Sequence, residues 1–119
     1  MSTLSEFLLA RIAEDEEWAR FAKRGNPPIT SARILAECEA KRALIADLNS
    51  ERHEVVDGDC WYTCSAATEE RDGGETCDDS RLHGECDCGR DARVTRRLGI
   101  LAAVYADHAD YATARYPRP

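Results

Sequence analysis

The stretch that decides the fold is rich in cysteine: Cys60-Trp-Tyr-Thr-Cys64, then Cys77, then Cys86-Asp-Cys88. Thiols one to four residues apart can converge on a single tetrahedral metal ion, because a tight turn directs both sulfurs to the same side. These five cysteines are therefore the predicted metal ligands, and structural zinc is the predicted ion. A closed site needs four ligands, so one thiol is spare, and Cys77 is the first choice for it.

Other states of these thiols stay open on sequence alone. His83 lies in the same stretch and could replace one of the sulfurs as a ligand. Disulfides, an iron–sulfur cluster and unliganded thiols rank below a structural zinc site, because clustered cysteines in a reducing compartment more often bind metal. A catalytic metal ion is disfavoured as well, since catalytic sites usually keep an open position beside histidine or carboxylate ligands.

Two helices are predicted before the cysteine-rich stretch. The first begins at a capping box that opens at Thr3, and it ends near Gly25, which can adopt the left-handed conformation of a C-cap. The second is predicted to begin at Thr30 or Ser31 and to continue to about Val56, because apolar residues recur along it at helical spacing.

Two residues of the second predicted helix carry side chains that could bind a metal. Cys38 falls within the apolar stripe, and we interpret it as a buried core thiol, since free cysteine behaves as a small hydrophobic residue. His53 falls near the predicted C-terminal end of this helix. We interpret it as a residue that satisfies the helix dipole, and it is not among the predicted ligands.

A third helix is predicted to begin at Asp91, which is a good N-cap, with Val94, Leu98, Leu101 and Tyr105 on its inner face. The aromatic tail that follows is expected to pack back on the helices. The predicted fold class is mainly α: a small three-helix domain with a metal-stabilised cysteine-rich loop between the second and third helices. A single domain is expected, with two helices in residues 1–56, the metal loop in 57–91, and the third helix and tail in 92–119.

The composition explains why such a chain would need a metal. Leu, Ile, Val and Phe together number 20 of 119 residues, which is low for a chain of this charge. A small domain with so little apolar surface gains little from core burial, so metal coordination is a common way to hold it together.

Charge and hydropathy indicate where the protein works and what it does not bind. The net charge is −7, and residues 57–91 hold eleven acidic residues against three arginines, which amounts to −8 in that segment. Such a segment disfavours non-specific binding to phosphate backbones. The acidic residues near the start argue against a secretory signal, and no stretch is long and apolar enough for a membrane span. We therefore expect a cytoplasmic protein.

Parts of the sequence also resemble a known family. The stretch Ser31-Ala-Arg-Ile-Leu-Ala-Glu-Cys-Glu-Ala-Lys-Arg42 and the stretch from Arg96 to Tyr111 are similar to a family of small actinobacterial and actinophage proteins that is described only as a domain of unknown function. The opening Phe7-Leu-Leu-Ala-Arg-Ile-Ala-Glu-Asp-Glu16 fits the same pattern. The chain departs from the family in two ways: the family tail usually has proline in place of Ala103 or Val104 and again at Ala109, and many members lack the full set of cysteines. This resemblance implies phage or prophage as one origin of the gene, and it implies no activity.

Three functional hypotheses follow from these observations. The preferred one is a non-enzymatic, zinc-binding interaction protein whose acidic loop binds a basic surface of a host or other cellular protein. The second is a regulator that contacts nucleic acid through its arginines, namely Arg93, Arg96, Arg97, Arg115 and Arg118, although the negative net charge disfavours nucleic acid as a partner. The third is a metal-dependent enzyme, which would require an open coordination position.

Overall fold

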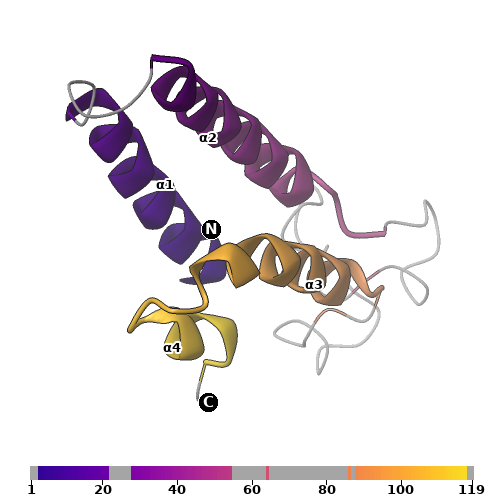
Figure 1. Ribbon diagram of the computed structural model, residues 1–119. Helices are drawn as coiled ribbons and strands as arrows, with labels where there is room; N and C mark the ends of the chain where they lie inside the picture. The colour runs from indigo at the N-terminus through magenta and orange to yellow at the C-terminus, as the bar shows by residue number, and fades with distance from the viewer. Residues whose placement is uncertain (1–2, 22–27, 55–63, 65–85, 87, 118–119) are drawn as a thin grey trace. The chain divides into compact units, whose positions relative to one another are not determined.

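The computed structural model describes residues 3–21, 28–54, 64, 86 and 88–117 (Figure 1). These residues are mainly helical, as predicted, and no strand occurs among them. The elements in chain order are α1 (Thr3–Phe21), α2 (Pro28–Asn49), α3 (Arg90–Ala102), the 3-10 helix η5 (Ala103–Tyr105) and α4 (Tyr111–Arg115). None of the described helices is both long enough and apolar enough to cross a membrane.

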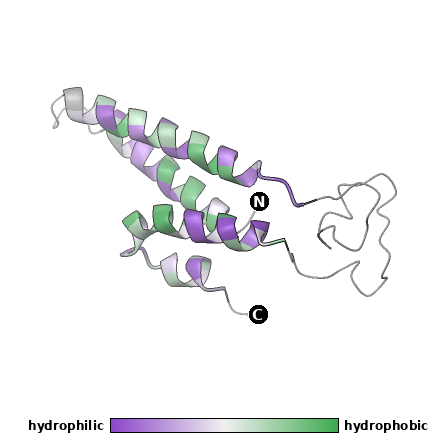
Figure 2. Ribbon diagram, turned by 90° about the vertical axis from the view of Figure 1, so that its right-hand side faces the viewer, coloured by the Kyte–Doolittle hydropathy of each residue, from purple (hydrophilic) through white to green (hydrophobic). Residues whose placement is uncertain are grey.

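The chain divides into two compact units. We call residues 1–49 together with 96–119 the helical unit, and residues 50–95 the cysteine unit. The division falls within α3, whose first residues are hydrophilic and whose last residues are hydrophobic (Figure 2). The single-domain organisation stays a prediction.

The helical unit is built on the antiparallel pairing of α1 with α2 (Figure 1). Leu4, Leu8 and Ile12 of α1 are almost completely buried, and so are Ile45 and Leu48 of α2. These residues recur every three or four positions, so each helix buries one apolar face in the other. The spacing that predicted the first two helices therefore also places the core.

Polar contacts fix the register of this pair. The guanidinium of Arg42 donates two hydrogen bonds to the carboxylate of Glu16, at 2.6 and 3.1 Å. Near the other end, the amide of Asn49 donates to the hydroxyl of Ser5 at 3.0 Å. The hydrogen bonds from Arg42 hold the pKa of the Glu16 carboxyl below its usual value.

The aromatic tail packs on α1, as the sequence predicted. The ring of Phe7 meets the rings of Tyr105, His108 and Tyr111 at centroid distances of 6.3, 5.6 and 6.2 Å. His108 also hydrogen-bonds locally, because its Nδ1 accepts from the backbone N–H of Asp110 at 3.0 Å. Aromatic contacts of this kind add to the stability that burial alone supplies.

Tyr105 connects the tail to both helices of the pair. Its hydroxyl donates to a carboxylate oxygen of Asp15 on α1 at 2.9 Å and accepts from the Nζ of Lys41 on α2 at 3.3 Å. The ammonium of Lys41 also lies 5.2 Å from the centroid of the Tyr105 ring. Burial, together with the hydrogen bond to Asp15, raises the pKa of Tyr105 well above its usual value.

Several predicted boundaries differ from the observed ones. α2 begins at Pro28 and ends at Asn49, about seven residues before the predicted end near Val56. The chain leaves the helix at Asn49-Ser50, a pair of residues that favours turns over helix interiors. α3 begins at Arg90, one residue before the predicted start, and the short α4 is a helix that the sequence analysis did not identify.

Candidate metal centre

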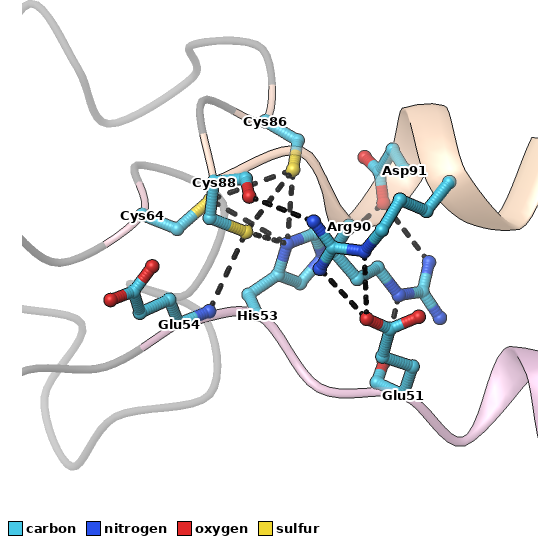
Figure 3. A network of polar contacts seen from close by, with 9 residues as sticks. Glu51, His53, Glu54, Cys64, Cys86, Cys88, Arg90 and Asp91 are labelled. Carbon is cyan, nitrogen blue, oxygen red and sulfur yellow. Dashed lines mark hydrogen bonds and ion pairs between the residues drawn. The ribbon is translucent and has the colours of Figure 1, made fainter.

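Four potential metal ligands converge in the cysteine unit. They are the imidazole of His53 and the thiols of Cys64, Cys86 and Cys88, whose ligand atoms all lie within 4.8 Å of one another (Figure 3). The Nδ1 atom of His53 lies 3.5 Å from the sulfur of Cys64, 3.3 Å from that of Cys86 and 3.7 Å from that of Cys88. The sulfur of Cys86 lies 3.7 Å from that of Cys64 and 3.5 Å from that of Cys88.

These separations are those of a tetrahedron around a single ion. With metal–sulfur bonds of about 2.3 Å and a metal–nitrogen bond of about 2.0–2.1 Å, tetrahedral geometry puts sulfurs roughly 3.8 Å apart and sulfur about 3.5 Å from nitrogen. The observed separations span 3.3–3.7 Å. One histidine and three cysteines can therefore hold a metal ion, and they would fill its four positions.

The segment that follows α2 brings two of these ligands together. The backbone N–H of Cys64 donates to the carbonyl of Glu54 at 2.9 Å, so the backbone of Cys64 lies beside the residue that follows His53. The backbone N–H of Glu54 in turn donates to the sulfur of Cys88 at 3.5 Å. Backbone N–H groups that point at metal-binding sulfurs stabilise them as thiolates.

The other two ligands stand at the start of α3. The chain turns through Gly89, which has a φ of 85°, and the carbonyl of Gly89 accepts the first hydrogen bond of the helix, from the N–H of Arg93 at 3.0 Å. Only glycine adopts this conformation without strain, and a Cβ atom here would lie 2.9 Å from the Arg93 guanidinium. Gly89 thus lets the cysteine pair join directly onto a helix.

Asp91 orients the histidine. Its carboxylate lies 3.5 Å from the Nε2 of His53, on the opposite side of the ring from the sulfurs (Figure 3). A carboxylate at one ring nitrogen favours a proton on that nitrogen, and this leaves Nδ1 with a free lone pair. Carboxylate–histidine–metal arrangements of this kind are usual in protein metal sites.

Glu51 ties the segment after α2 to the start of α3. Its carboxylate accepts two hydrogen bonds from Arg93, at 2.7 and 3.1 Å. Its backbone carbonyl accepts one from Arg90 at 2.7 Å (Figure 3). Arg93 also donates to the carbonyl of Cys88 at 3.2 Å. The segment that carries His53 and the segment that carries Cys88 are therefore joined by these hydrogen bonds, in addition to the convergence of their side chains.

The pKa values of two ligand thiols move in opposite directions. Burial works against the charged form of Cys86, but hydrogen bonds, chiefly from the backbone N–H of Asp91, more than offset it and lower the pKa of this thiol. Burial raises the pKa of Cys88, even though the backbone groups of Glu54 and Arg90 donate to its sulfur. A bound cation would favour the thiolate at both positions.

The structure brings together three of the five predicted ligands. Cys64, Cys86 and Cys88 lie in the site, whereas Cys60, Cys77 and the alternative ligand His83 fall outside the described residues. Cys38 lies in the helical unit, is 1% exposed, and is the buried core thiol that the sequence predicted.

The interpretation of His53 is wrong. Because α2 ends at Asn49, His53 cannot serve the dipole of that helix, and its ring faces the three sulfurs instead. The turn-favouring pair Asn49-Ser50 is the sequence signal that could have shown that the helix ends before His53. A histidine in an extended segment shortly before a cysteine-rich stretch is a better ligand candidate than a histidine within a helix.

Sequence comparison relates the chain to one family. Residues 26–115 match a family of unknown function, DUF6221, and because this match covers most of the chain, the protein belongs to that family. No curated protein and no solved structure is significantly similar to the chain.

Proposed function

We propose that the chain is a zinc-binding interaction protein without catalytic activity of its own. The observation that carries this proposal is the set of near-tetrahedral separations among His53 Nδ1 and the sulfurs of Cys64, Cys86 and Cys88. One histidine with three cysteines is a common ligand set of structural zinc sites. The space among four atoms within 4.8 Å of one another suits one ion better than a cluster of several irons.

A structural role for the ion follows from how little else holds the cysteine unit. Among its described residues the buried apolar side chains are Cys64 and Val94. Zinc would join the segment after α2, the central stretch and the start of α3 at one point, and its binding free energy would become folding free energy. Four protein ligands also leave no position for a substrate or an activated water, which is the reason for proposing no enzymatic activity.

The proposed partner is a cellular protein with a basic surface. Residues 57–91 carry eleven acidic residues and three arginines, and three thiolates on one divalent ion would add about one further negative charge. A concentrated field of one sign steers association and selects partners of the opposite sign.

One of the arginines that the alternative of nucleic-acid binding requires, Arg93, already has partners within the protein. Arg93 donates two hydrogen bonds to the carboxylate of Glu51 and one to the carbonyl of Cys88, so its guanidinium is already occupied. An arginine held in this way would have to break two hydrogen bonds to one carboxylate oxygen, Oε1 of Glu51, before it could bind a phosphate.

Metal analysis of the purified protein tests the zinc proposal. We expect one zinc per chain, and after cobalt substitution we expect an absorption spectrum of tetrahedral cobalt with three sulfur ligands. His53→Ala should weaken binding, whereas His53→Cys should retain it with a four-sulfur spectrum. Cys38→Ala is the matched control, because it removes a cysteine outside the site. Protein that stays ordered in residues 50–95 without any metal would refute the proposal.

A further inference from the structure

Two adjoining hollows lie along the groove between α1 and α2 in the helical unit. The larger, of about 430 Å³, is lined by residues of both helices: Asp15, Trp18, Ile34, Glu37, Cys38 and Lys41. The smaller, of about 270 Å³, extends along α2 to Thr30 and Arg33. Ile34 and Glu37 line both hollows, so together they form one groove, which we call the hairpin groove.

The hairpin groove exists because the core is thin at this end of the pair. The inward positions of α2 recur every seven residues, and they carry Ser31, then Cys38, then Ile45. At this end of the pair, α1 contributes the small Ala19, which is completely buried. Such small side chains do not fill the space between the two helices, and the volume that they leave unfilled forms the groove.

The walls of the groove combine an aromatic ring with apolar and acidic side chains. Trp18 remains 50% exposed, while Cys38 is 1% exposed and closes the bottom. A half-exposed tryptophan beside a hollow is the residue type most often found at the centre of protein–protein interfaces. The volume of the larger hollow is within the range of known ligand pockets.

The larger hollow has the carboxylates of Asp15 and Glu37 against the ammonium of Lys41, so its charges favour a cationic guest. Arg33, the other cation of the groove, lines the smaller hollow. Lys41 is engaged with Tyr105 through both a hydrogen bond and a ring contact, and Asp15 accepts from the same hydroxyl. Glu37 is exposed and has no hydrogen-bond or ion-pair partner among the described residues. Directly before Trp18, the exposed Glu17 adds negative charge, whereas Glu14 and Glu16 are paired with arginines.

We propose that the hairpin groove binds an arginine side chain of a partner protein. The guanidinium would stack on the indole of Trp18 and donate to the carboxylate of Glu37, while its aliphatic stem covers Ile34. Arginine suits this site better than lysine, because its planar group can stack and form paired hydrogen bonds at once. The proposal deepens the proposed function, since it rests on a basic protein partner, but it does not depend on zinc.

Peptide binding to the whole zinc-loaded chain tests the proposal. The background variant Trp61→Phe leaves Trp18 as the only tryptophan, so its fluorescence reports on the groove alone. The probe is an acetylated, amidated peptide with one arginine between two leucines, and its counterpart carries citrulline, which has the same shape without the charge. We expect the arginine peptide to change the Trp18 emission and to bind at least tenfold more tightly than the citrulline peptide.

Two variants of α2 make the test specific. Glu37→Gln should weaken binding of the arginine peptide about tenfold, whereas Glu39→Gln, an exposed glutamate on the same helix outside the groove, should leave it unchanged. Equal binding of the arginine and citrulline peptides, or no effect of Glu37→Gln, overturns the proposal. Zinc content is measured on the same samples, so a failure of the groove is distinguishable from a failure of the metal site.

Discussion

The interactions that stabilise the helical unit differ in kind from those within the cysteine unit. The helical unit buries a continuous apolar core, with Leu8, Ile12, Ile45 and Leu98 at most 2% exposed. The described part of the cysteine unit has few buried apolar side chains, and its contacts are hydrogen bonds, ion pairs and four converging side chains that could hold a metal ion. The first kind of stability is spread over many residues, whereas the second is concentrated at one point. The two units should therefore respond to different perturbations.

Removal of the proposed metal ion should have the largest effect on stability, and this effect should be confined to the cysteine unit. Apparent binding free energies of structural zinc are about 10–16 kcal/mol, so a chelator or the double variant Cys86→Ser with Cys88→Ser should unfold much of residues 50–95. Amide hydrogen exchange measured residue by residue checks this. Protection in α1 and α2 should persist. Loss of protection throughout α1 and α2 would contradict the separation of the two units.

A cavity in the helical unit should destabilise that unit and leave the metal site of the cysteine unit intact. Leu8 is fully buried, so Leu8→Ala should lower the free energy of unfolding of the helical unit by about 2–5 kcal/mol. Denaturant titration followed by circular dichroism measures this change. The matched control is Leu44→Ala, because Leu44 is 45% exposed. The cobalt spectrum of the Leu8 variant should be unchanged under native conditions, and a lost spectrum would show that the two units are coupled.

The smallest effect concerns the ion pair between α1 and α2. Because Arg42 holds the pKa of Glu16 below that of an unfolded glutamate, the pair stabilises the fold above the unfolded pKa, and this contribution is lost as the pH falls through the folded pKa. With Arg42 41% exposed, Glu16→Gln should cost only about 0.2–1 kcal/mol at neutral pH. The cost should vanish in acid.

Stability curves of three proteins at pH 7 and in acid check this last effect. The wild type and Glu16→Gln should differ at pH 7 and converge at low pH. Glu17→Gln, which changes the exposed neighbour, should match the wild type throughout. A difference between the wild type and Glu16→Gln that persists in acid would mean that the carboxylate acts through packing.

Sequence periodicity predicted the helices of the helical unit well, because the core residues of these helices recur at the spacing of helical turns. Leu4, Leu8 and Ile12 lie one turn apart, so the face that they share could be identified without coordinates. The end of α2 was predicted too late because Val55 and Val56 continue an apolar pattern beyond Asn49. Local composition does not show that the chain has already left the helix to meet a distant segment.

Spacing in the sequence indicated only part of the candidate metal site, for a related reason. Cys86 and Cys88 are neighbours in the sequence, so their convergence is a local property that spacing can reveal. His53 lies 33 residues before Cys86, and only the fold brings its Nδ1 to 3.3 Å from that sulfur. Ligands contributed from far along the chain cannot be found by spacing, because their distance depends on where the intervening elements begin and end.

The joining of the cysteine pair to α3 through Gly89 has one more consequence. Glycine has no side chain with which to cap a helix, and the sulfurs of Cys86 and Cys88 take over that task by accepting from the N–H groups of Asp91 and Arg90. Two of the four candidate ligands are thus also the N-terminal cap of the helix. The exchange of these two amide protons with solvent would report whether the ion is bound, without any spectroscopic label.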